Sequence, residues 1–223
     1  MDERYSRTVK ITGEKGLERL RSAKVLIVGV GGVGSYAAEA VARAGAGSIT
    51  LIDGDTVQPS NLNRQLVALT STLGMNKAEV MAERIRDISP DTEVTALAVF
   101  YKEGDALDLS AFDWIVDAID DVDAKTALIR SAKKQGVNII SSMGAAGKLG
   151  TDFKVADIYE TSVCPLAKVM RKRLKDSGVK ELPVVYSEEK PIPRDGDLGT
   201  LSYVPGSAGL TLAGYVIRKI AEL

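Results

Sequence analysis

The 223-residue sequence predicts an α/β protein built on a doubly wound, mainly parallel β-sheet, and three observations lead to this expectation. Short runs of Val, Ile and Leu alternate with longer segments of helical periodicity through the first two-thirds of the chain. A glycine-rich turn follows the first apolar run, and carboxylates follow the second and fourth. Strands that are separated by helices are joined by right-handed crossovers, which produce a parallel sheet.

The first two-thirds of the chain supply the strands and helices of this sheet in turn. Each expected strand is a short run dominated by apolar and β-branched residues, whereas the expected helices carry apolar residues three and four positions apart. The expected strands are Val25–Val28, Ser48–Ile52, Thr92–Phe100, Trp114–Ala118 and Val137–Ile140, and the expected helices are Gly32–Gly45, Met75–Ile88 and Val122–Gln135.

After Gly144 the pattern changes. Pro165 and Gly178 bracket a segment with helical periodicity, and proline in the first turn with glycine beyond the last is typical of a helix. The charged segment Glu188–Gly199 contains prolines and glycines. We interpret it as a loop that either closes over a site or simply crosses the surface. In order, the expected elements are the strand Phe153–Tyr159, the helix Pro165–Lys175, the strand Val184–Ser187 and a C-terminal helix that starts near Gly206.

The composition excludes several kinds of chemistry. A net charge of −1 gives no overall attraction to nucleic acid or to an anionic membrane. The sequence has no histidine, which removes the most frequent general base and the most frequent zinc ligand. The single cysteine, Cys164, excludes an internal disulfide and a paired-cysteine metal site. We therefore expect no bound zinc.

Two segments bear on the location of the protein. Residues 1–10 are polar and mixed in charge, unlike a signal peptide. Residues 198–217 carry no charge over a length that could span a bilayer, but Pro205 and four glycines favour a buried helix instead. One thiol also suits a reducing compartment. We expect a cytoplasmic protein with no membrane association.

The glycine-rich turn has the spacing of a dinucleotide-binding loop. Gly29, Gly31 and Gly34 would allow a tight turn, close approach of a phosphate and close packing of helix on strand, and Gly32 lies between them. Asp53 follows the second strand, where it can accept hydrogen bonds from ribose hydroxyls. These features predict a Rossmann-like nucleotide-binding fold. They fit a nicotinamide-dependent dehydrogenase equally well, and a glycine turn without a ligand is the remaining alternative.

Three polar side chains on the loop after the second strand favour a phosphate chain. Arg64 offers a rigid fork of donors that matches phosphate oxygens, and Asn61 and Gln65 stand beside it. Lys77 lies near the start of the next helix, where a cation opposes the helix dipole unless an anion is close by. The alternative for Arg64 and Lys77 is a solvated surface charge.

Carboxylates at the end of the fourth strand predict a magnesium site. Mg²⁺ is usually bound by one or two carboxylates together with substrate phosphates, and Asp117, Asp120 and Asp121 occupy this strand end. Asp is also a frequent helix N-cap, so capping of the following helix is the alternative role for Asp120 or Asp121.

In this order the motifs resemble the superfamily of adenylating enzymes that includes ThiF, MoeB and the ubiquitin-activating enzymes. The motifs, which cover residues 4 to about 144, are Arg4-Tyr5-Ser6-Arg7, Gly29–Ser35, Asp53-Gly54-Asp55, Ser60–Gln65, Gly74-x-x-Lys77 and Asp117-x-x-Asp120. The resemblance implies that ATP and Mg²⁺ bind. It also implies one adenylating domain, residues 1–223, with a nucleotide-binding core (1–144) and a substrate-side elaboration that ends in the C-terminal helix (145–223).

The resemblance assigns a role to each of these residues. Arg64 and Lys77 would steady the phosphates, Asp120 would hold magnesium, and Arg7 would reach the ATP of the partner subunit in a homodimer. The remaining nucleotide-binding positions would be the four loop glycines with Asp53, Asp55, Asn61 and Gln65.

Within the superfamily, the later part of the chain resembles the tRNA threonylcarbamoyladenosine dehydratases. The segments that carry this resemblance are Ser142–Ala145, Val155–Ile158, Thr161–Ala167 and Val185–Ser187. MoeB and ThiF usually carry two Cys-x-x-Cys zinc pairs, which one cysteine cannot supply. The dehydratase reaction would activate a carboxylate as an acyl-adenylate, and an internal nitrogen would then close a ring and release AMP. Such a ring closure requires neither a catalytic cysteine nor a histidine base.

Two further features lie beyond the core. Cys164 is interpreted as a small buried thiol at a helix start, with a thioester or persulfide as the alternative. A cationic run follows it with no acid between Glu160 and Asp176. It predicts either a solvated helix face or a contact with tRNA phosphates. The run comprises Lys168, Arg171, Lys172, Arg173 and Lys175.

Two other functions remain open from the sequence. One is adenylation of a ubiquitin-like sulfur-carrier protein, and a sulfur-transfer partner is conceivable in either case. The other is a nucleotide-binding sensor or scaffold without turnover, against which Arg64, Lys77 and Asp120 argue.

Overall fold

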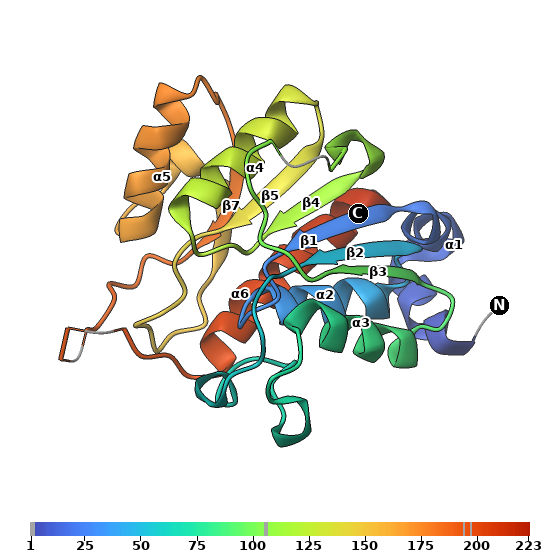
Figure 1. The fold of residues 1–223 in the computed structure, drawn as a ribbon. Helices are drawn as coiled ribbons and strands as arrows, with labels where there is room; N and C mark the ends of the chain where they lie inside the picture. Colours follow the sequence, from blue (N-terminus) through green and yellow to red (C-terminus); the bar gives the residue numbers. More distant parts are fainter. Residues whose placement is uncertain (1–2, 105–106, 194, 197) are drawn as a thin grey trace.

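A single sheet of seven strands lies at the centre of the part of the chain that the computed structural model describes, residues 3–104, 107–193, 195–196 and 198–223 (Figure 1). The strand order is β3-β2-β1-β4-β5-β7-β6, and only β6 runs antiparallel to its neighbour. The expected doubly wound, mainly parallel sheet is therefore confirmed. The strands are β1 (Lys24–Val28), β2 (Ser48–Ile52), β3 (Glu93–Leu97), β4 (Trp114–Asp117), β5 (Asn138–Ser142), β6 (Lys154–Asp157) and β7 (Pro183–Tyr186).

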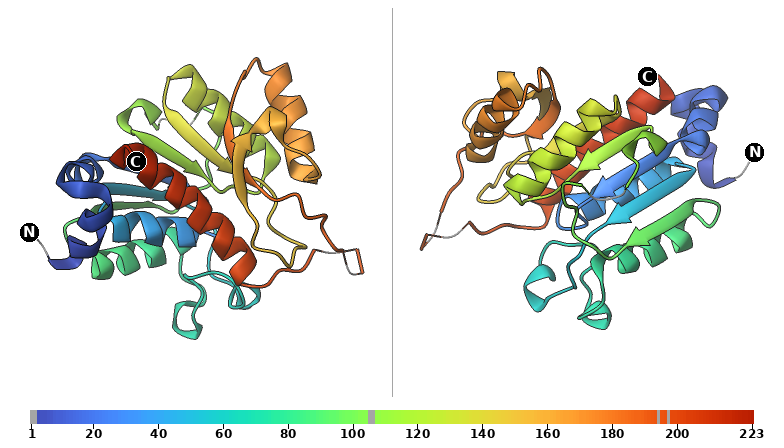
Figure 2. Two further views of the ribbon diagram at one scale, coloured as in Figure 1. Left: turned by 180° about the vertical axis from the view of Figure 1, so that it is seen from behind. Right: turned by 45° about the horizontal axis from the view of Figure 1, so that its top comes forward.

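Helices cover both faces of this sheet (Figures 1 and 2). Helices α2, α3 and α6 pack on one face, and α4 and α5 pack on the other. Helix α1 lies beside the C-terminal part of α6. The α-helices are α1 (Ser6–Ser22), α2 (Gly34–Ala44), α3 (Lys77–Ile88), α4 (Val122–Lys134), α5 (Pro165–Asp176) and α6 (Tyr203–Ala221). Short 3-10 helices are η1 (Glu3–Tyr5), η2 (Pro59–Asn61), η3 (Thr70–Thr72), η4 (Leu109–Ala111) and η5 (Ile158–Glu160).

The central strand shows why the apolar runs in the sequence are nearly continuous. Val25 and Ile27 of β1 point into the core beneath α2, while Leu26 and Val28 point into the core beneath α4. All four side chains are buried because helices lie on both sides. Complete burial of one such side chain stabilises the fold by roughly 1.5–3 kcal/mol.

Element boundaries differ from the expected ones for local reasons. Helix α3 begins at Lys77 rather than near Met75, because the side chain of Asn76 caps it by accepting from the N–H groups of Ala78 and Glu79. The C-terminal helix begins at Tyr203 instead of near Gly206. Proline is favoured within a first turn, so Pro205 does not delay the start of α6.

Helix α1 was not expected from the sequence pattern. Gly13 interrupts this helix with φ of 68° and ψ of 171°, so α1 consists of two shorter helical pieces. In the described part of the chain, no helix is both long enough and apolar enough to cross a bilayer.

The chain changes direction across the sheet between β1 and β4. From β1 it continues outward through β2 and β3, and it then returns to place β4 on the other side of β1. Ligands of open α/β sheets bind at such a switch point, outside the carboxyl ends of the strands. The ends of β1, β2 and β4 meet there.

Candidate active site

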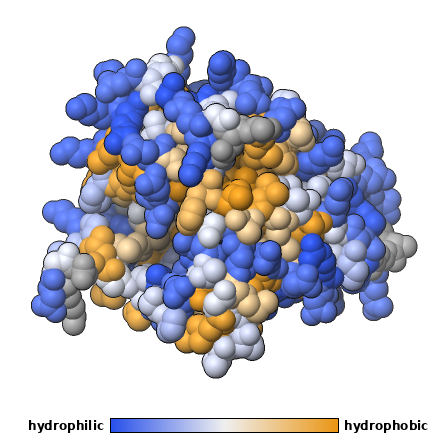
Figure 3. All heavy atoms as spheres, viewed as in Figure 1, coloured by the Kyte–Doolittle hydropathy of each residue, from blue (hydrophilic) through white to orange (hydrophobic). Residues whose placement is uncertain are grey.

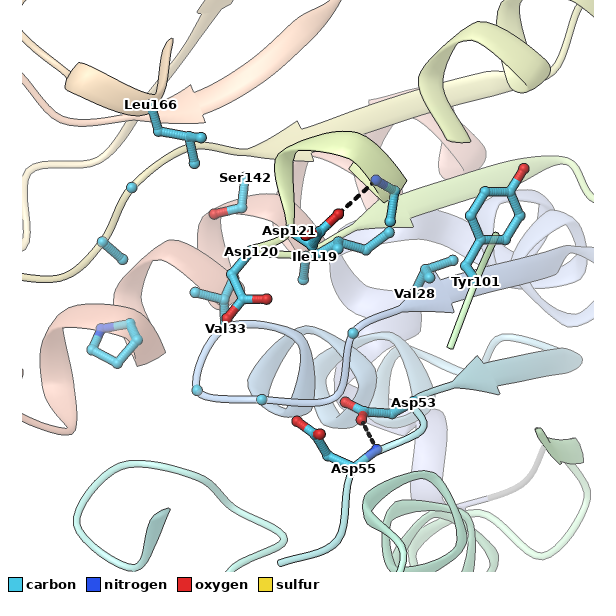
Figure 4. A pocket seen from close by; sticks show the side chains of 18 of the residues that line it. Val28, Val33, Asp53, Asp55, Tyr101, Ile119, Asp120, Asp121, Ser142 and Leu166 are labelled. Atoms are coloured by element: carbon cyan, nitrogen blue, oxygen red, sulfur yellow. Dashed lines mark hydrogen bonds between the residues drawn. The ribbon is translucent and has the colours of Figure 1, made fainter. Parts of the chain in front are cut away.

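A cavity of about 950 Å³ opens at this switch point. Its wall combines the glycine loop, the segments after β2 and β4, and the crossover that leads to α6. Figure 4 shows that Asp53 and Asp55 approach it from β2, while Asp120 and Asp121 approach it from the end of β4. The predicted site residues that line the cavity are Gly29, Gly31, Gly32, Asp53, Asp55, Arg64, Gln65, Lys77 and Asp120.

The glycine loop has little room for side chains. Gly29 adopts φ of +89°, and a Cβ there would lie 2.6 Å from the carbonyl oxygen of Ala118. A Cβ on Gly34 would lie 1.7 Å from the carbonyl oxygen of Gly29. Gly34 is therefore needed for the packing of α2 on the loop, and it does not itself line the cavity. Gly31 and Gly32 leave the cavity side of the loop open.

Asp53 is fixed beneath this loop. One carboxylate oxygen accepts from the Val30 N–H at 2.6 Å, and the other accepts from the Asp55 N–H at 2.9 Å. Burial raises the pKa of Asp53 above its ordinary value, although these N–H groups and the charge of Lys77 oppose the increase. Each oxygen keeps a free lone pair in this arrangement, so the carboxylate can also accept from ribose hydroxyls.

Lys77 and Asp55 form an ion pair on the floor of the cavity. Lys77 Nζ lies 2.8 Å from Asp55 Oδ2, and the Lys77 N–H donates to the Asp55 carbonyl. The lysine side chain is buried, whereas the Asp55 side chain is 54% exposed. Asp55 is thus the anion that offsets the unfavourable position of Lys77 at the start of α3.

The Arg64 loop is held by its own backbone and by Asn63. Arg64 Nη1 donates to the Ser60 carbonyl at 2.8 Å and to Asn63 Oδ1 at 2.9 Å. Gln65 is buried and lines the cavity. Asn61 does not line it, because Asn61 Oδ1 accepts from the Gln58 N–H and so fixes the shape of the loop.

The carboxylates after β4 have three different environments. Asp121 caps α4 by accepting from the Ala124 N–H at 2.8 Å. Asp117 is fully buried and pairs with the fully buried Lys125, with 2.9 Å between Oδ2 and Nζ. Asp120 is exposed and lines the cavity, and Asp121 is exposed and lines it as well, although it also caps α4. Helix capping therefore applies to Asp121, and Asp120 remains available for a ligand.

Lys125 is a residue that the sequence analysis missed. Its Nζ also donates to the Ile119 carbonyl at 2.8 Å, so it fixes the turn that carries Asp120. A signal was present, because Lys125, Leu128 and Ala132 lie on the same buried stripe of α4. A lysine on such a stripe needs a buried partner.

The far wall of the cavity contains Cys164 and the crossover segment. Cys164 is 1% exposed at the N-cap of α5, which confirms the expectation of a buried thiol at a helix start. Burial lowers the pKa of the nearby Lys148, and the negative charge of Glu189 opposes this change. Lys148 Nζ donates to the Glu189 carbonyl.

The segment Glu188–Gly199 is tied to residues 147–150 at several points. The Glu189 carboxylate accepts from the N–H groups of Leu149 and Gly150, both at 2.8 Å. The Gly147 N–H donates to the Gly199 carbonyl, also at 2.8 Å. Positions 194 and 197 lie outside the described residues. Closure of this loop over a ligand stays a prediction.

Two cations of the helix that was predicted to contact tRNA, Arg171 and Arg173, have partners within the chain. Arg173 pairs with Asp123 of α4, so the expectation that the run lacks a counter-charge is wrong for this residue. Arg171 donates to the Thr161 carbonyl at 2.8 Å. Lys168, Lys172 and Lys175 are exposed, and Arg173 is exposed as well despite its ion pair. Figure 3 shows hydrophilic side chains over the region of α5.

Arg7 does not join the cavity of its own chain. It is exposed in the first turn of α1, which lies toward the opposite end of the sheet (Figure 1).

The glycine loop, the acid after β2, Arg64 and Lys77 line one cavity, and sequence comparison identifies the family of the chain. The ThiF family model matches residues 5–222. The chain belongs to the ThiF family. The resemblance stated from the motifs is thereby confirmed.

Relatives within the family agree in detail. The tRNA threonylcarbamoyladenosine dehydratase of Bacillus subtilis is 40% identical, and the match covers 100% of this chain and 96% of the relative. The crystal structure of the Escherichia coli dehydratase TcdA in complex with ATP superposes with a TM-score of 0.93 at 36% identity, covering 98% of this chain and 94% of that one. A molybdopterin-synthase adenylyltransferase of Haemophilus influenzae is 36% identical over a match that covers 64% of this chain and 59% of that protein. Only the dehydratases among these three match along the whole chain.

Proposed function

We propose that this ThiF-family protein uses ATP to activate the threonyl carboxylate of threonylcarbamoyladenosine in tRNA, and that the activated group then cyclises. The observation that carries the proposal is one cavity in which the glycine loop, Asp53, Arg64 and Lys77 converge with the exposed Asp120. Relatives that match the chain over its whole length have the corresponding name.

The chemistry begins with a poor electrophile. A carboxylate cannot expel oxide, so its oxygen first attacks the α-phosphorus of ATP and pyrophosphate leaves. A carbamoyl nitrogen of the same substrate then attacks the activated carbonyl, loses its proton to solvent and expels AMP. Both reacting groups belong to one molecule, so holding them close supplies much of the rate enhancement.

Arg64 and Lys77 would act electrostatically on the first step. Negative charge grows on the phosphate oxygens as pyrophosphate departs, and cations fixed in advance stabilise it without reorganising. Lys77 is already fixed by Asp55, and Arg64 is oriented by Ser60 and Asn63. Proton transfer by a histidine is not part of this scheme, consistent with a sequence that has none.

The donor set also fits magnesium. Asp120 is an exposed carboxylate on the cavity wall, and Mg²⁺ binds through one or two carboxylates together with phosphates. Bound there, the ion would neutralise charge on the triphosphate. A cluster of three or more His, Cys, Asp or Glu does not occur among the described residues, so the phosphates would have to supply other ligands.

Two exposed sets of cations support proposals about partners. Arg7 is exposed and lies away from its own cavity, which supports a homodimer in which it reaches the partner's nucleotide. Exposed cations on α5 support a contact with tRNA phosphates, and the helix begins at the cavity wall with Cys164. The cations proposed for this contact are Lys168, Lys172 and Lys175, since the exposed Arg173 pairs with Asp123. We place the reaction in the cytoplasm.

Pyrophosphate release from ATP tests the function directly. We expect release with tRNA that carries threonylcarbamoyladenosine and none with the same tRNA lacking the modification. Asp120→Ala should abolish release, and Asp176→Ala, an exposed acid at the end of α5, is the matched control. Equal rates on both tRNAs, or none on either, would remove the assignment.

A second candidate is adenylation of a ubiquitin-like sulfur-carrier protein. The match to the molybdopterin-synthase adenylyltransferase supports it over part of the chain. Exchange of pyrophosphate into ATP that depends on a carrier protein, and not on tRNA, would favour it and would also point to a sulfur-transfer partner. Exchange with neither would favour a sensor or scaffold.

A further inference from the structure

Two buried side-chain atoms lack a hydrogen-bond partner in the described part of the chain, and both belong to residues on the cavity wall. They are Gln65 Oε1 and Thr200 Oγ1. Buried polar atoms are almost always paired, because an unpaired one costs about 1–3 kcal/mol. Two unpaired atoms in the same cavity indicate groups that a ligand satisfies.

Thr200 is rigidly placed relative to Arg64. Asn63 Nδ2 donates to the Thr200 carbonyl at 3.0 Å, and Asn63 Oδ1 accepts from Arg64 at 2.9 Å. One side chain thus fixes both the guanidinium and the backbone of Thr200. On its other side, the neighbouring Gly199 carbonyl accepts from the Gly147 N–H. The Thr200 hydroxyl therefore shares a compartment with the cation that would grip phosphate.

The glycine loop closes the same compartment. A Cβ on Gly32 would lie 3.3 Å from the Pro205 side chain and 3.6 Å from Arg64 Cγ. The start of α6, the Arg64 loop and the glycine loop therefore meet at one point. A hydroxyl has one proton to donate, and the groups that neighbour it here are arranged for an anion.

We propose that Thr200 is a further substrate-binding residue whose hydroxyl donates a hydrogen bond to a phosphate oxygen of ATP. The inference rests on the proposed function only in taking ATP as the nucleotide. It adds a contact from the crossover segment before α6, which is remote in sequence from the phosphate-binding motifs.

The test compares Thr200→Val, which removes the hydroxyl with little change of shape, with Thr200→Ser, which keeps it. Affinity for ATP is measured by calorimetry without tRNA. Thr200→Val should weaken ATP binding about tenfold or more, because hydrogen bonds to charged groups contribute about 1.5–3 kcal/mol. Thr200→Ser should restore affinity to within about threefold of the parent. Thr151→Val, at an exposed threonine off the cavity, should not change it.

Two further measurements separate a binding role from a structural one. Without nucleotide, Thr200→Val should be at least as stable as the parent, because it removes an unpaired buried hydroxyl. If Thr200→Val weakens the binding of ATP but not of AMP, the contact is with the outer phosphates. If it weakens the binding of both equally, the contact is with the α-phosphate.

Affinity for ATP within twofold of the parent would overturn the inference, as would a Thr200→Val protein that binds weakly because it is destabilised. Absence of ATP binding by the parent would overturn both proposals. Normal ATP binding without tRNA-dependent turnover would overturn only the proposed function.

Discussion

The buried ion pair between Asp117 and Lys125 gives the sharpest test of the structural reasoning. Both side chains are 0% exposed, with 2.9 Å between Oδ2 and Nζ. Lys125→Met removes the positive charge and leaves the Asp117 carboxylate buried, with the Ser141 hydroxyl and the Ile119 N–H as its donors. Removing one partner of a buried pair costs about 3–5 kcal/mol. Since whole domains are stabilised by about 5–15 kcal/mol, this loss is a large fraction of the total.

Urea unfolding measures the effect. With an m-value of about 2 kcal/mol/M, a loss of that size lowers the midpoint by about 1.5–2.5 M. Lys134→Met, at an exposed position on the same helix, is the control and should change stability by less than about 0.5 kcal/mol. The double variant Asp117→Asn/Lys125→Met removes both charges and should be more stable than Lys125→Met alone. A urea unfolding midpoint of Lys125→Met within about 0.5 M of the parent would refute the argument that Asp117 remains buried from water without its cationic partner.

The other predictions concern two glycines, Gly34 at the start of α2 and Gly214 on α6, and the carboxylate of Asp53. Gly34→Ala should cost several kcal/mol and weaken ATP binding, because its Cβ would lie 1.7 Å from the Gly29 carbonyl oxygen. Gly214→Ala on α6 meets nothing within 4 Å and should stabilise by about 0.5–1 kcal/mol, so equal thermal shifts in both variants would contradict the steric argument. Burial raises the pKa of Asp53, so the folded protein binds more protons than the unfolded chain between the two pKa values, and stability falls as pH rises through that window. The free energy of unfolding of Asp53→Asn, measured relative to that of the parent, should therefore increase as the pH rises from about 3.5 to 7. A difference between the two proteins that does not vary with pH would count against this.

Local chemistry explains which parts of the fold could be predicted from the sequence. The strand–loop–helix unit around Gly29 and the acid at Asp53 were predictable, because glycine and carboxylate positions there are dictated by backbone geometry. The start of α3 was less certain, since the capping role of Asn76 depends on its contacts with Asp53 and Asp55. Helix α1 was not anticipated, because Gly13 breaks its periodicity.

The residues of the candidate site were likewise only partly predictable from the sequence. Arg64, Lys77 and Asp120 were found because each follows a strand or starts a helix. The sequence could not show that Asp117 and Asp121 have different roles. Asp117 forms a buried ion pair with Lys125, and only the folded structure brings these two side chains together. Thr200 carries no local signal, and its position depends on Asn63, which is distant along the chain.

Helix α6 joins the nucleotide loop to the opposite end of the molecule. Gly209 packs against the backbone of Val33, and Ala221 contacts Gly16 of α1. Helix α6, near the C-terminus, thus covers part of α2, which lies near the N-terminus of the chain. A chain that contains residues 1–144 alone lacks α6, so the part of α2 that packs against α6 is left uncovered.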